Sequence, residues 1–235
     1  QPMPSRRQRQ MCIRDRYIKD KKDSDVLLFL DGYDTFISDS ISEILYRYLE
    51  FNSQIVFSSE RICWPDELIA PKLKELNINQ NTPYQYLNSG MYIGRIGRLK
   101  ELLAHPLQND EDDQFYMQRE YLRNPKGIVC DVEQYMFITS DYSVIQRNGQ
   151  LYNPITRCYG CAYHGNGGVK EKQRCEILYH QFYSQFNYVP TKSYDILSDD
   201  MLLIDFMSED MCKKMISLSE KHTFKSLSYD KVKGQ

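Results

Sequence analysis

The sequence of 235 residues predicts an α/β fold with a parallel sheet, and three consecutive segments indicate it. Residues 26–30 form an apolar run of strand length. Residues 38–49 begin with helix-capping Ser and Asp residues and continue with apolar residues at helical spacing. Residues 54–58 form a second apolar run. A strand, a helix and a strand in this order predict a βαβ unit, in which the two strands are parallel.

The next segment is expected to be irregular before it returns to the sheet. Pro65, Pro71 and Pro83 break up the connection that follows the second strand. Residues 87–94 then predict a turn followed by a short apolar strand, in which Gly90 permits either a positive φ angle or a close backbone approach.

Shorter elements complete the expected domain. Helices are predicted at 95–104, at 114–122 and from 170 to about 183. Acidic residues at 109–113 suit the positive end of the dipole of the second of these helices. Strands are predicted at 128–131, 135–139 and 143–146, and a glycine-rich loop covers 164–168.

The two ends of the chain differ from the middle. Residues 1–20 are expected to be a non-native or disordered leader, because their Arg-rich start lacks apolar periodicity, and a basic nucleic-acid arm is the functional alternative. Residues 21–190 carry the predicted fold, and residues 191–200 are expected to be a linker. Residues 201–235 hold one predicted strand and one amphipathic helix, which cannot bury a core, so they are expected to begin a truncated second domain.

Composition excludes some classes of protein and leaves others open. A formal net charge of -2 gives no electrostatic case for a nucleic-acid partner. No apolar stretch approaches the roughly 20 residues of a membrane-spanning helix. Of seven Cys, only Cys158 and Cys161 form a CxxC pair, and zinc would need a second pair, so a local disulfide or two buried thiols are favoured.

Two carboxylates directly follow the first predicted strand. Asp31 and Asp34 lie at its carboxyl end, where open α/β sheets bind their ligands. A hard divalent ion such as Mn²⁺ or Mg²⁺ takes oxygen ligands of this kind. The alternative is an acidic turn in solvent.

Two further polar clusters fall at loop or helix ends. Asp112, Asp113 and Gln114 begin a predicted helix, where the alternative is a solvated helix N-terminus. The glycine-rich loop and the helix after it contribute a third cluster: His164, Asn166 and Lys170. Two carboxylates and a neutral imidazole make a mixed oxygen and nitrogen set that Mn²⁺ accepts. For the histidine, the alternative is a surface loop position.

Five motifs of this sequence resemble, in order and approximate spacing, the glycosyltransferase domain of the procollagen lysyl hydroxylase family. This family includes multifunctional lysyl hydroxylase/glucosyltransferases and giant-virus members. The motifs are FLDGYD at 29–34, FSSE at 57–60 with CWP at 63–65, LNSG at 87–90, DDQFY at 112–116 and HGNG at 164–167. The resemblance covers about residues 25–190.

The resemblance implies a GT-A-like (Rossmann-like) fold that here lacks its N-terminal nucleotide-binding strands. It implies Mn²⁺-dependent transfer of glucose or galactose from UDP-glucose or UDP-galactose to hydroxylysine-linked acceptors on collagen-like protein. Because few residues precede Val26, UDP binding by this chain is expected to be impaired. A homodimer is expected for the full-length protein, in the endoplasmic reticulum lumen for a eukaryotic parent and in the host cytoplasm or virion for a viral one.

Roles for individual residues follow from the same resemblance. The metal ligands are Asp31, Asp34 and His164. The residues near the sugar and the acceptor are Asp112, Asp113 and Trp64, and the diphosphate loop contributes Gly165, Asn166 and Lys170. Family members have Pro-Thr before this lysine, whereas this chain has Gly168-Val169, so it departs from the family pattern directly before Lys170.

Two other functions remain open at this point. An aspartate-nucleophile phosphatase also has a strand that ends in paired Asp before Thr, but its two Asp are at i and i+2, on one side of the strand. A non-catalytic module that binds collagen-like peptide is the second alternative. Residues 203–216 resemble the opening of a 2-oxoglutarate/iron dioxygenase domain, yet no His is followed two residues later by Asp, so no hydroxylase activity is expected.

Overall fold

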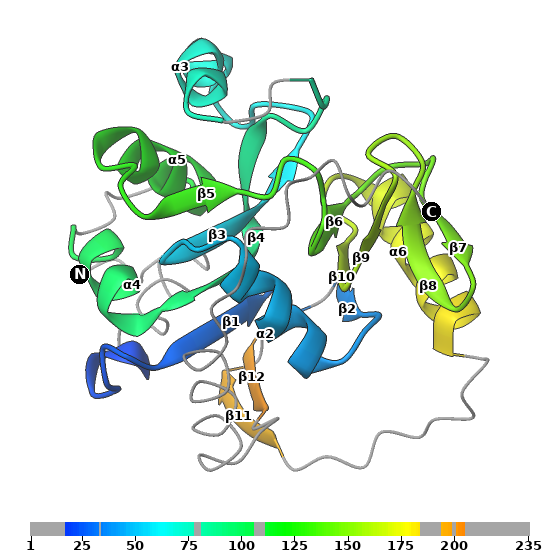
Figure 1. The fold of residues 1–235 in the computed structure, drawn as a ribbon, viewed down its shortest axis with the longest axis horizontal. Coiled ribbons are helices and arrows are strands. Elements are labelled where there is room, and N and C mark those ends of the chain that lie inside the picture. The colour runs from blue at the N-terminus through cyan, green and yellow to red at the C-terminus, as the bar shows by residue number, and fades with distance from the viewer. Residues whose placement is uncertain are drawn as a thin grey trace.

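The computed structural model describes residues 17–32, 34–77, 81–105 and 111–183, and the backbone of 194–198 and 201–204. Its centre is a four-stranded sheet with the order β1-β4-β3-β5 (Figure 1). The strands are β1 (Val26–Leu30), β3 (Ile55–Glu60), β4 (Tyr86–Arg95) and β5 (Ile128–Cys130). Strand β4 is antiparallel to β1 and to β3, and β5 is parallel to β3.

The predicted βαβ unit is therefore only partly correct. Strands β1 and β3 are parallel to each other, and helix α2 (Ile41–Glu50) connects them, as expected. However, the two strands are not neighbours, because β4 lies between them and runs in the opposite direction. The sheet is mixed rather than parallel.

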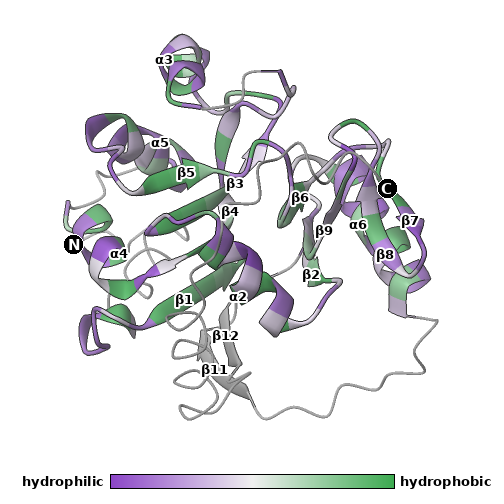
Figure 2. Ribbon diagram, in the orientation of Figure 1, coloured by the Kyte–Doolittle hydropathy of each residue, from purple (hydrophilic) through white to green (hydrophobic). Residues whose placement is uncertain are grey.

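Helices cover both faces of this sheet, which confirms the α/β class. Helix α2 packs on one face through Ile44 and Tyr48, which share a core cluster with Val56. Helices α4 (Ile96–Leu102) and α5 (Asp113–Arg123) pack on the other face, in a cluster that includes Ile55 and Phe57. Figure 2 shows the strands as mainly hydrophobic and α2 as largely hydrophilic on its outer side. Successive side chains of β3 therefore point to opposite faces of the sheet and pack in different core clusters.

Strand β4 is longer than predicted and contains no turn. It runs through the Asn88-Ser89-Gly90 sequence without a break. The polar sequence marks a bulge instead: Phe57 of β3 pairs with Tyr92, whereas the next residue, Ser58, pairs with Asn88. Bulges of this kind bend a strand and re-aim its side chains. The predicted turn is therefore a local irregularity within one continuous strand.

A second, smaller group of strands lies beside the central sheet (Figure 1). One three-stranded sheet has the order β2-β10-β6, and another has the order β7-β8-β9. Their bounds are β2 (Thr35–Ile37), β6 (Phe137–Thr139), β7 (Ile145–Arg147), β8 (Gln150–Asn153), β9 (Cys158–Gly160) and β10 (Ala162–His164). Helix α6 (Val169–Tyr183) packs against them in a third core cluster, through Leu178 and Phe182. The sequence predicted β6, β7 and α6 but not β2, β8, β9 or β10.

The remaining elements are short. A 3-10 helix, η1 (Glu67–Ile69), and helix α3 (Ala70–Glu75) occupy the connection that was expected to be irregular. Strands β11 (Tyr194–Ser198) and β12 (Met201–Ile204) form an antiparallel hairpin, with β11 inside the predicted linker. Ile18, at the end of the predicted leader, is fully buried in the first core cluster. Residues 1–16 and the helix predicted after 208 lie outside the described residues.

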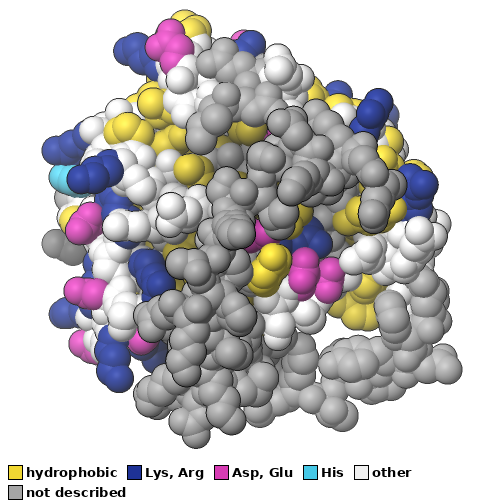
Figure 3. All heavy atoms as spheres, in the orientation of Figure 1, with side chains coloured by type: hydrophobic (Ala, Val, Ile, Leu, Met, Phe, Trp, Pro, Cys, Tyr) yellow, Lys and Arg dark blue, Asp and Glu magenta, His cyan; other side chains and the backbone are white. Residues whose placement is uncertain are grey.

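The cysteines, the apolar length of the helices and the surface charges complete the description. The five cysteines within the described ranges, Cys158 and Cys161 among them, are free thiols, so the disulfide alternative is wrong for this pair. No helix among the described residues is long and apolar enough to cross a membrane. On the face shown in Figure 3, basic and acidic side chains are interspersed along the edge that carries α4. The Nζ atom of Lys100 in this helix lies 2.8 Å from Oδ1 of Asp23.

Candidate metal centre

The loop between β1 and β2 joins the two groups of strands, and both ends of it are fixed by backbone hydrogen bonds. The N–H of Asp31 donates to the carbonyl of Gly90 in β4, at 2.8 Å. The N–H of Gly165 donates to the carbonyl of Asp34, at 2.7 Å. In addition, Thr35 at the start of β2 pairs with His164 at the end of β10. The two aspartates and the histidine, which are distant in sequence, therefore meet at this junction.

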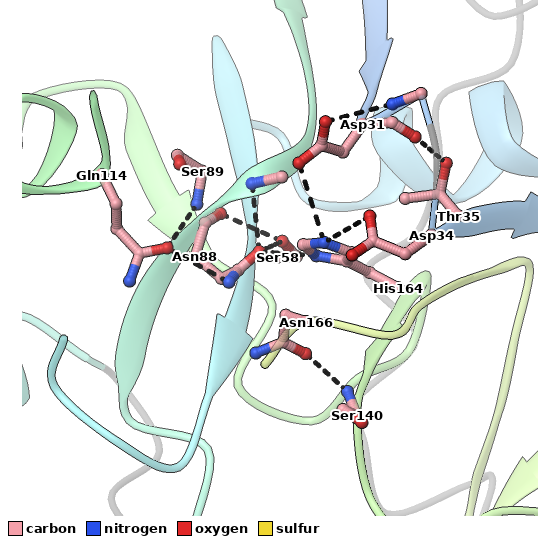
Figure 4. Close-up of polar contacts among 12 residues, drawn as sticks. Asp31, Asp34, Thr35, Ser58, Asn88, Ser89, Gln114, Ser140, His164 and Asn166 are labelled. Carbon is pink, nitrogen blue, oxygen red and sulfur yellow. Dashed lines mark hydrogen bonds and ion pairs between the residues drawn. The ribbon is translucent and has the colours of Figure 1, made fainter. Parts of the chain in front are cut away.

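The side chains of Asp31, Asp34 and His164 form one cluster (Figure 4). The Nε2 atom of His164 lies 3.4 Å from Oδ1 of Asp34 and 3.9 Å from Oδ2 of Asp31. The three potential ligand atoms all lie within 4.8 Å of one another. His164 and Asp34 are buried, whereas 42% of the Asp31 side chain is exposed. The histidine is therefore not a surface loop residue, and the cluster is open to solvent on the Asp31 side.

Gly90 makes room for the imidazole of His164. A Cβ atom added at Gly90 would overlap the ring, whose atoms would be its nearest neighbours. The positive-φ glycines of the described chain are Gly127, Gly149 and Gly167, so Gly90 does not serve a turn. Of the two expectations for this glycine, the close approach is the correct one.

Lys172 supplies a positive charge beside the cluster. Its Nζ atom lies 3.3 Å from Oδ2 of Asp34, from a position one turn into α6. Burial alone would raise the pKa of Asp34, but Lys172 and an imidazole of His164 that is protonated on both nitrogens together lower it below its ordinary value. Asp34 is therefore ionised at neutral pH, as a metal ligand must be.

A network of buried amides surrounds Glu60 next to this cluster. Its Oε1 atom accepts from Nδ2 of Asn88 at 3.1 Å and from Nε2 of Gln114 at 2.7 Å. Its Oε2 atom accepts from Nδ2 of Asn166 at 2.6 Å. Burial raises the pKa of Glu60, although these hydrogen bonds and the nearby His164 act to lower it. Glu60 thus connects β3 to β4, to α5 and to the glycine-rich loop.

The second polar cluster of the sequence reaches this network through Gln114. Asp112 caps α5: its Oδ1 atom accepts from the N–H groups of Gln114 and Phe115, at 3.0 and 3.3 Å. Asp113 is the first residue of the helix and is partly buried. Asp112 is therefore the cap of this helix, and the residue that contacts Glu60 is Gln114, which follows the aspartate pair.

Trp64 lies beside the start of the same helix. Its carbonyl accepts from the side-chain amides of Gln114 and Gln118, at 2.8 and 3.0 Å. Its peptide bond to Pro65 is cis, and 60% of the residue is exposed. The amides hold the backbone of Trp64 while its indole remains accessible from solvent.

The glycine-rich loop is held in place from two sides. Oδ1 of Asn166 accepts from the N–H of Ser140 at 2.7 Å, while its Nδ2 contacts Glu60. Gly165 packs closely against Cys175 of α6. Lys170 is exposed at the start of α6, and the lysine that reaches Asp34 is Lys172.

Sequence reasoning did not assign roles to Glu60, Asn88 and Lys172. Glu60 and Asn88 were part of the motifs that carried the family resemblance. A carboxylate at the end of a fully buried strand is rare enough to have marked Glu60 as a candidate. To identify Lys172 from the sequence, one would need to know which side of α6 faces the loop, and no short motif provides this.

Comparisons with known proteins agree with the motifs. The chain is 30% identical over 155 residues to uncharacterized protein R699 of Acanthamoeba polyphaga mimivirus, an alignment that covers 64% of this chain and 33% of that protein. It is 31% identical over 98 residues to the human multifunctional procollagen lysine hydroxylase and glycosyltransferase LH3, covering 41% of this chain and 13% of LH3. It is 29% identical over 177 residues to mouse procollagen-lysine,2-oxoglutarate 5-dioxygenase 2, covering 70% and 22%.

These relatives are much longer, so the chain spans a third or less of the length of each. A solved structure of galactosyltransferase LgtC, in complex with donor and acceptor sugar analogues, aligns with 75% of this chain and 67% of that chain. The TM-score is 0.41 at 14% identity, which is too low to establish a shared fold. The family model described as the PLOD GT domain matches residues 11–179, well over half of the sequence. The chain therefore belongs to the family of PLOD glycosyltransferase domains.

Proposed function

We propose that this domain transfers glucose or galactose from a UDP-sugar to hydroxylysine-linked acceptors on collagen-like protein, with Mn²⁺ held by Asp31, Asp34 and His164. The observation that carries the proposal is the cluster of these three side chains in a family of glycosyltransferase domains. We also propose that the α/β fold of this domain is GT-A-like.

The donor set fits the proposed ion. Two carboxylates and one imidazole suit Mn²⁺, which accepts oxygen and nitrogen ligands together. The exposed side of Asp31 provides access for phosphate oxygens, which would complete the coordination. Mn²⁺ bound here would act as a Lewis acid toward the charge that develops on the departing UDP. Mg²⁺ is the competing ion for the carboxylates, and the imidazole favours Mn²⁺.

The residues of the glycine-rich loop form the donor side of the proposed site. Gly165 and Asn166 fix the loop that we place against the diphosphate, through the carbonyl of Asp34 and through Glu60 and Ser140. Lysines act on phosphate as compact point charges. Lys172 joins Lys170 in this role, because Lys172 already contacts the carboxylate of Asp34.

The start of α5 and Trp64 form the acceptor side. The sugar carbon develops positive charge as UDP departs, and a nearby carboxylate stabilises that charge or orients the incoming hydroxyl. We assign this function to the Asp112 and Asp113 pair, with Asp112 also fixing the helix start through its cap. The exposed indole of Trp64 offers an aromatic surface to the acceptor.

A sugar-transfer assay on the chain tests the proposal. UDP release from UDP-glucose and from UDP-galactose would be measured with collagen-like peptides that carry hydroxylysine or galactosylhydroxylysine. At saturating UDP-sugar, we expect transfer with Mn²⁺ and a fall of about 100-fold or more after chelation, with recovery when Mn²⁺ is added back. Transfer that is insensitive to chelation would contradict the metal assignment.

The two alternative functions give different results in parallel assays. Hydrolysis of p-nitrophenyl phosphate that is lost in the Asp31→Ala variant would favour a phosphatase. Binding of the collagen-like peptide without any transfer, and without loss in the Asp31→Ala variant, would favour a binding module.

Lys172 is predicted to affect metal and donor binding in opposite directions. Without donor, it competes with a cation for Asp34, so Lys172→Met should tighten Mn²⁺ binding by about twofold to fivefold, the range of an exposed ion pair. With Mn²⁺ present, the same variant should bind UDP more weakly, because a positive charge is lost. Titration calorimetry measures both. Lys170→Met is the matched control for the first effect. Equal tightening of Mn²⁺ binding in both variants would show that the contact between Lys172 and Asp34 is not its cause.

A further inference from the structure

The side chain of Asn88, at the bulge of β4, contacts His164 on one side (Figure 4) and Glu60 on the other. Its Oδ1 atom accepts from the N–H of Gly90 at 3.0 Å. Its Nδ2 atom donates to Oε1 of Glu60 at 3.1 Å and to Oε1 of Gln114 at 3.2 Å. Asn88 is buried away from water, so its polar atoms and those of its partners must satisfy one another by hydrogen bonds.

These partners fix which way the amide of Asn88 points. If the amide were turned over, its NH₂ group would face the N–H of Gly90, and its oxygen would face the carboxylate of Glu60. Two donors, or two acceptors, would then meet in a buried place, at a cost of about 1–3 kcal/mol for each unsatisfied group. The oxygen of Asn88 is therefore held on the side of Gly90, which is also the side of His164.

The Nδ1 atom of His164 lies 3.0 Å from this fixed oxygen. An amide oxygen can only accept a hydrogen bond, so Nδ1 must carry the proton. In a neutral imidazole, Nε2 then has a lone pair, and Nε2 is the atom that faces Asp31 and Asp34. We propose that Asn88 is a positioning residue that holds His164 in the Nδ1-protonated form and so keeps Nε2 available to a divalent cation.

The need for such a residue follows from the carboxylates themselves. Without Asn88, the opposite tautomer would be favoured, because an Nε2–H group could donate to Oδ1 of Asp34, 3.4 Å away. That hydrogen bond would place a proton where the cation has to bind. Histidine ligands in proteins generally donate their other N–H to an oxygen that fixes the tautomer, and loss of that partner lowers metal affinity by about 10-fold to 100-fold. In this chain, Gly90 and Glu60 act on the metal site through Asn88.

The inference rests on the proposed metal site, and two measurements separate the two claims. The first is ¹⁵N NMR of the histidine side chains in the metal-free chain, recorded over a pH series so that the neutral imidazole is identified by its own signals. The signals of His164 are those missing from a His164→Gln variant. We expect Nδ1–H in the wild-type chain and a shift toward Nε2–H in Asn88→Ala.

The second measurement is Mn²⁺ affinity by electron paramagnetic resonance of the free ion. Asn88→Ala should weaken Mn²⁺ binding by about 10-fold to 100-fold. Asn77→Ala is the control, because Asn77 is also buried and its Nδ2 donates to the carbonyl of Gln85, away from the cluster. In the Asn77→Ala variant, the ¹⁵N signals of His164 and the Mn²⁺ affinity should match those of the wild type. Equal losses in both variants would show a general effect of removing a buried amide and would overturn the positioning role.

A wild-type imidazole with its proton on Nε2 would overturn the inference directly, even if Asn88→Ala fails to fold. If that result came with Mn²⁺-dependent sugar transfer, the proposed function would stand and the role of Asn88 would fall. An Nδ1–H form that depends on Asn88, in a chain without Mn²⁺-dependent transfer, would support the role of Asn88 and contradict the proposed function.

Discussion

Replacing Asp34 with asparagine is expected to reduce sugar transfer by roughly 1,000-fold, equivalent to about 4 kcal/mol of transition-state stabilisation. Asp34 is the buried carboxylate of the cluster, and asparagine keeps its shape while removing its charge. Mn²⁺ affinity should fall in the same variant, because a neutral amide is a poor substitute for a carboxylate ligand. Transfer kinetics and Mn²⁺ titration measure the two effects.

The fold should survive this substitution, since the main contacts of Asp34 to the second group of strands use its backbone. Its carbonyl accepts from the N–H of Gly165 and from the thiol of Cys175. Asp39→Asn is the matched control: Asp39 accepts from Ser40 and Gln150 and is not part of the cluster. Transfer by Asp34→Asn within tenfold of the wild type would refute the assignment of Asp34 as a ligand.

The second large effect concerns folding rather than catalysis. Asp131→Ala is expected to lower the free energy of unfolding by about 3–5 kcal/mol. The carboxylate of Asp131 is buried and accepts from three successive backbone N–H groups, those of Tyr135, Met136 and Phe137, at 2.7 to 2.8 Å. Alanine would leave all three donors without a partner at the entrance to β6, which pairs with the strand that carries His164.

Urea and thermal denaturation would measure this loss, which corresponds to a fall in melting temperature of roughly 10 °C for a chain of this size. Asp131→Asn should lose less, because one oxygen remains to accept while its NH₂ group opposes one N–H. Asp66→Ala is the control, since Asp66 accepts from a single exposed N–H, that of Leu68. A loss in Asp131→Ala no larger than in Asp66→Ala would contradict the explanation.

Sequence patterns predicted the class of the fold better than its connections. Apolar runs located β1 and β3, and helical spacing located α2, because these elements bury whole faces. The position of β4 between them was not predictable, since pairing across the sheet depends on segments far apart in the chain and both neighbours of a central strand are apolar. The last two residues of β3 were also missed, because Ser59 and Glu60 are polar yet buried.

For the candidate site, the residue types were more informative than the spacing. Two carboxylates after a strand and a histidine at the start of a glycine-rich loop were expected to meet, and Asp31, Asp34 and His164 do form one cluster. The contacts of Asn88 and Lys172 were not visible in the sequence. They depend on a bulge in β4 and on the rotation of α6, and both are set by packing in three dimensions.

Gly90 has a consequence for reading other sequences of this family. The space next to Gly90 of β4 has room for one side chain, and the ring of His164 fills it. A chain can therefore hold either a side chain on the strand or an imidazole beside the carboxylates, but not both. A larger residue at the position of Gly90 would indicate a member in which the histidine has moved or been replaced, without any ion being measured.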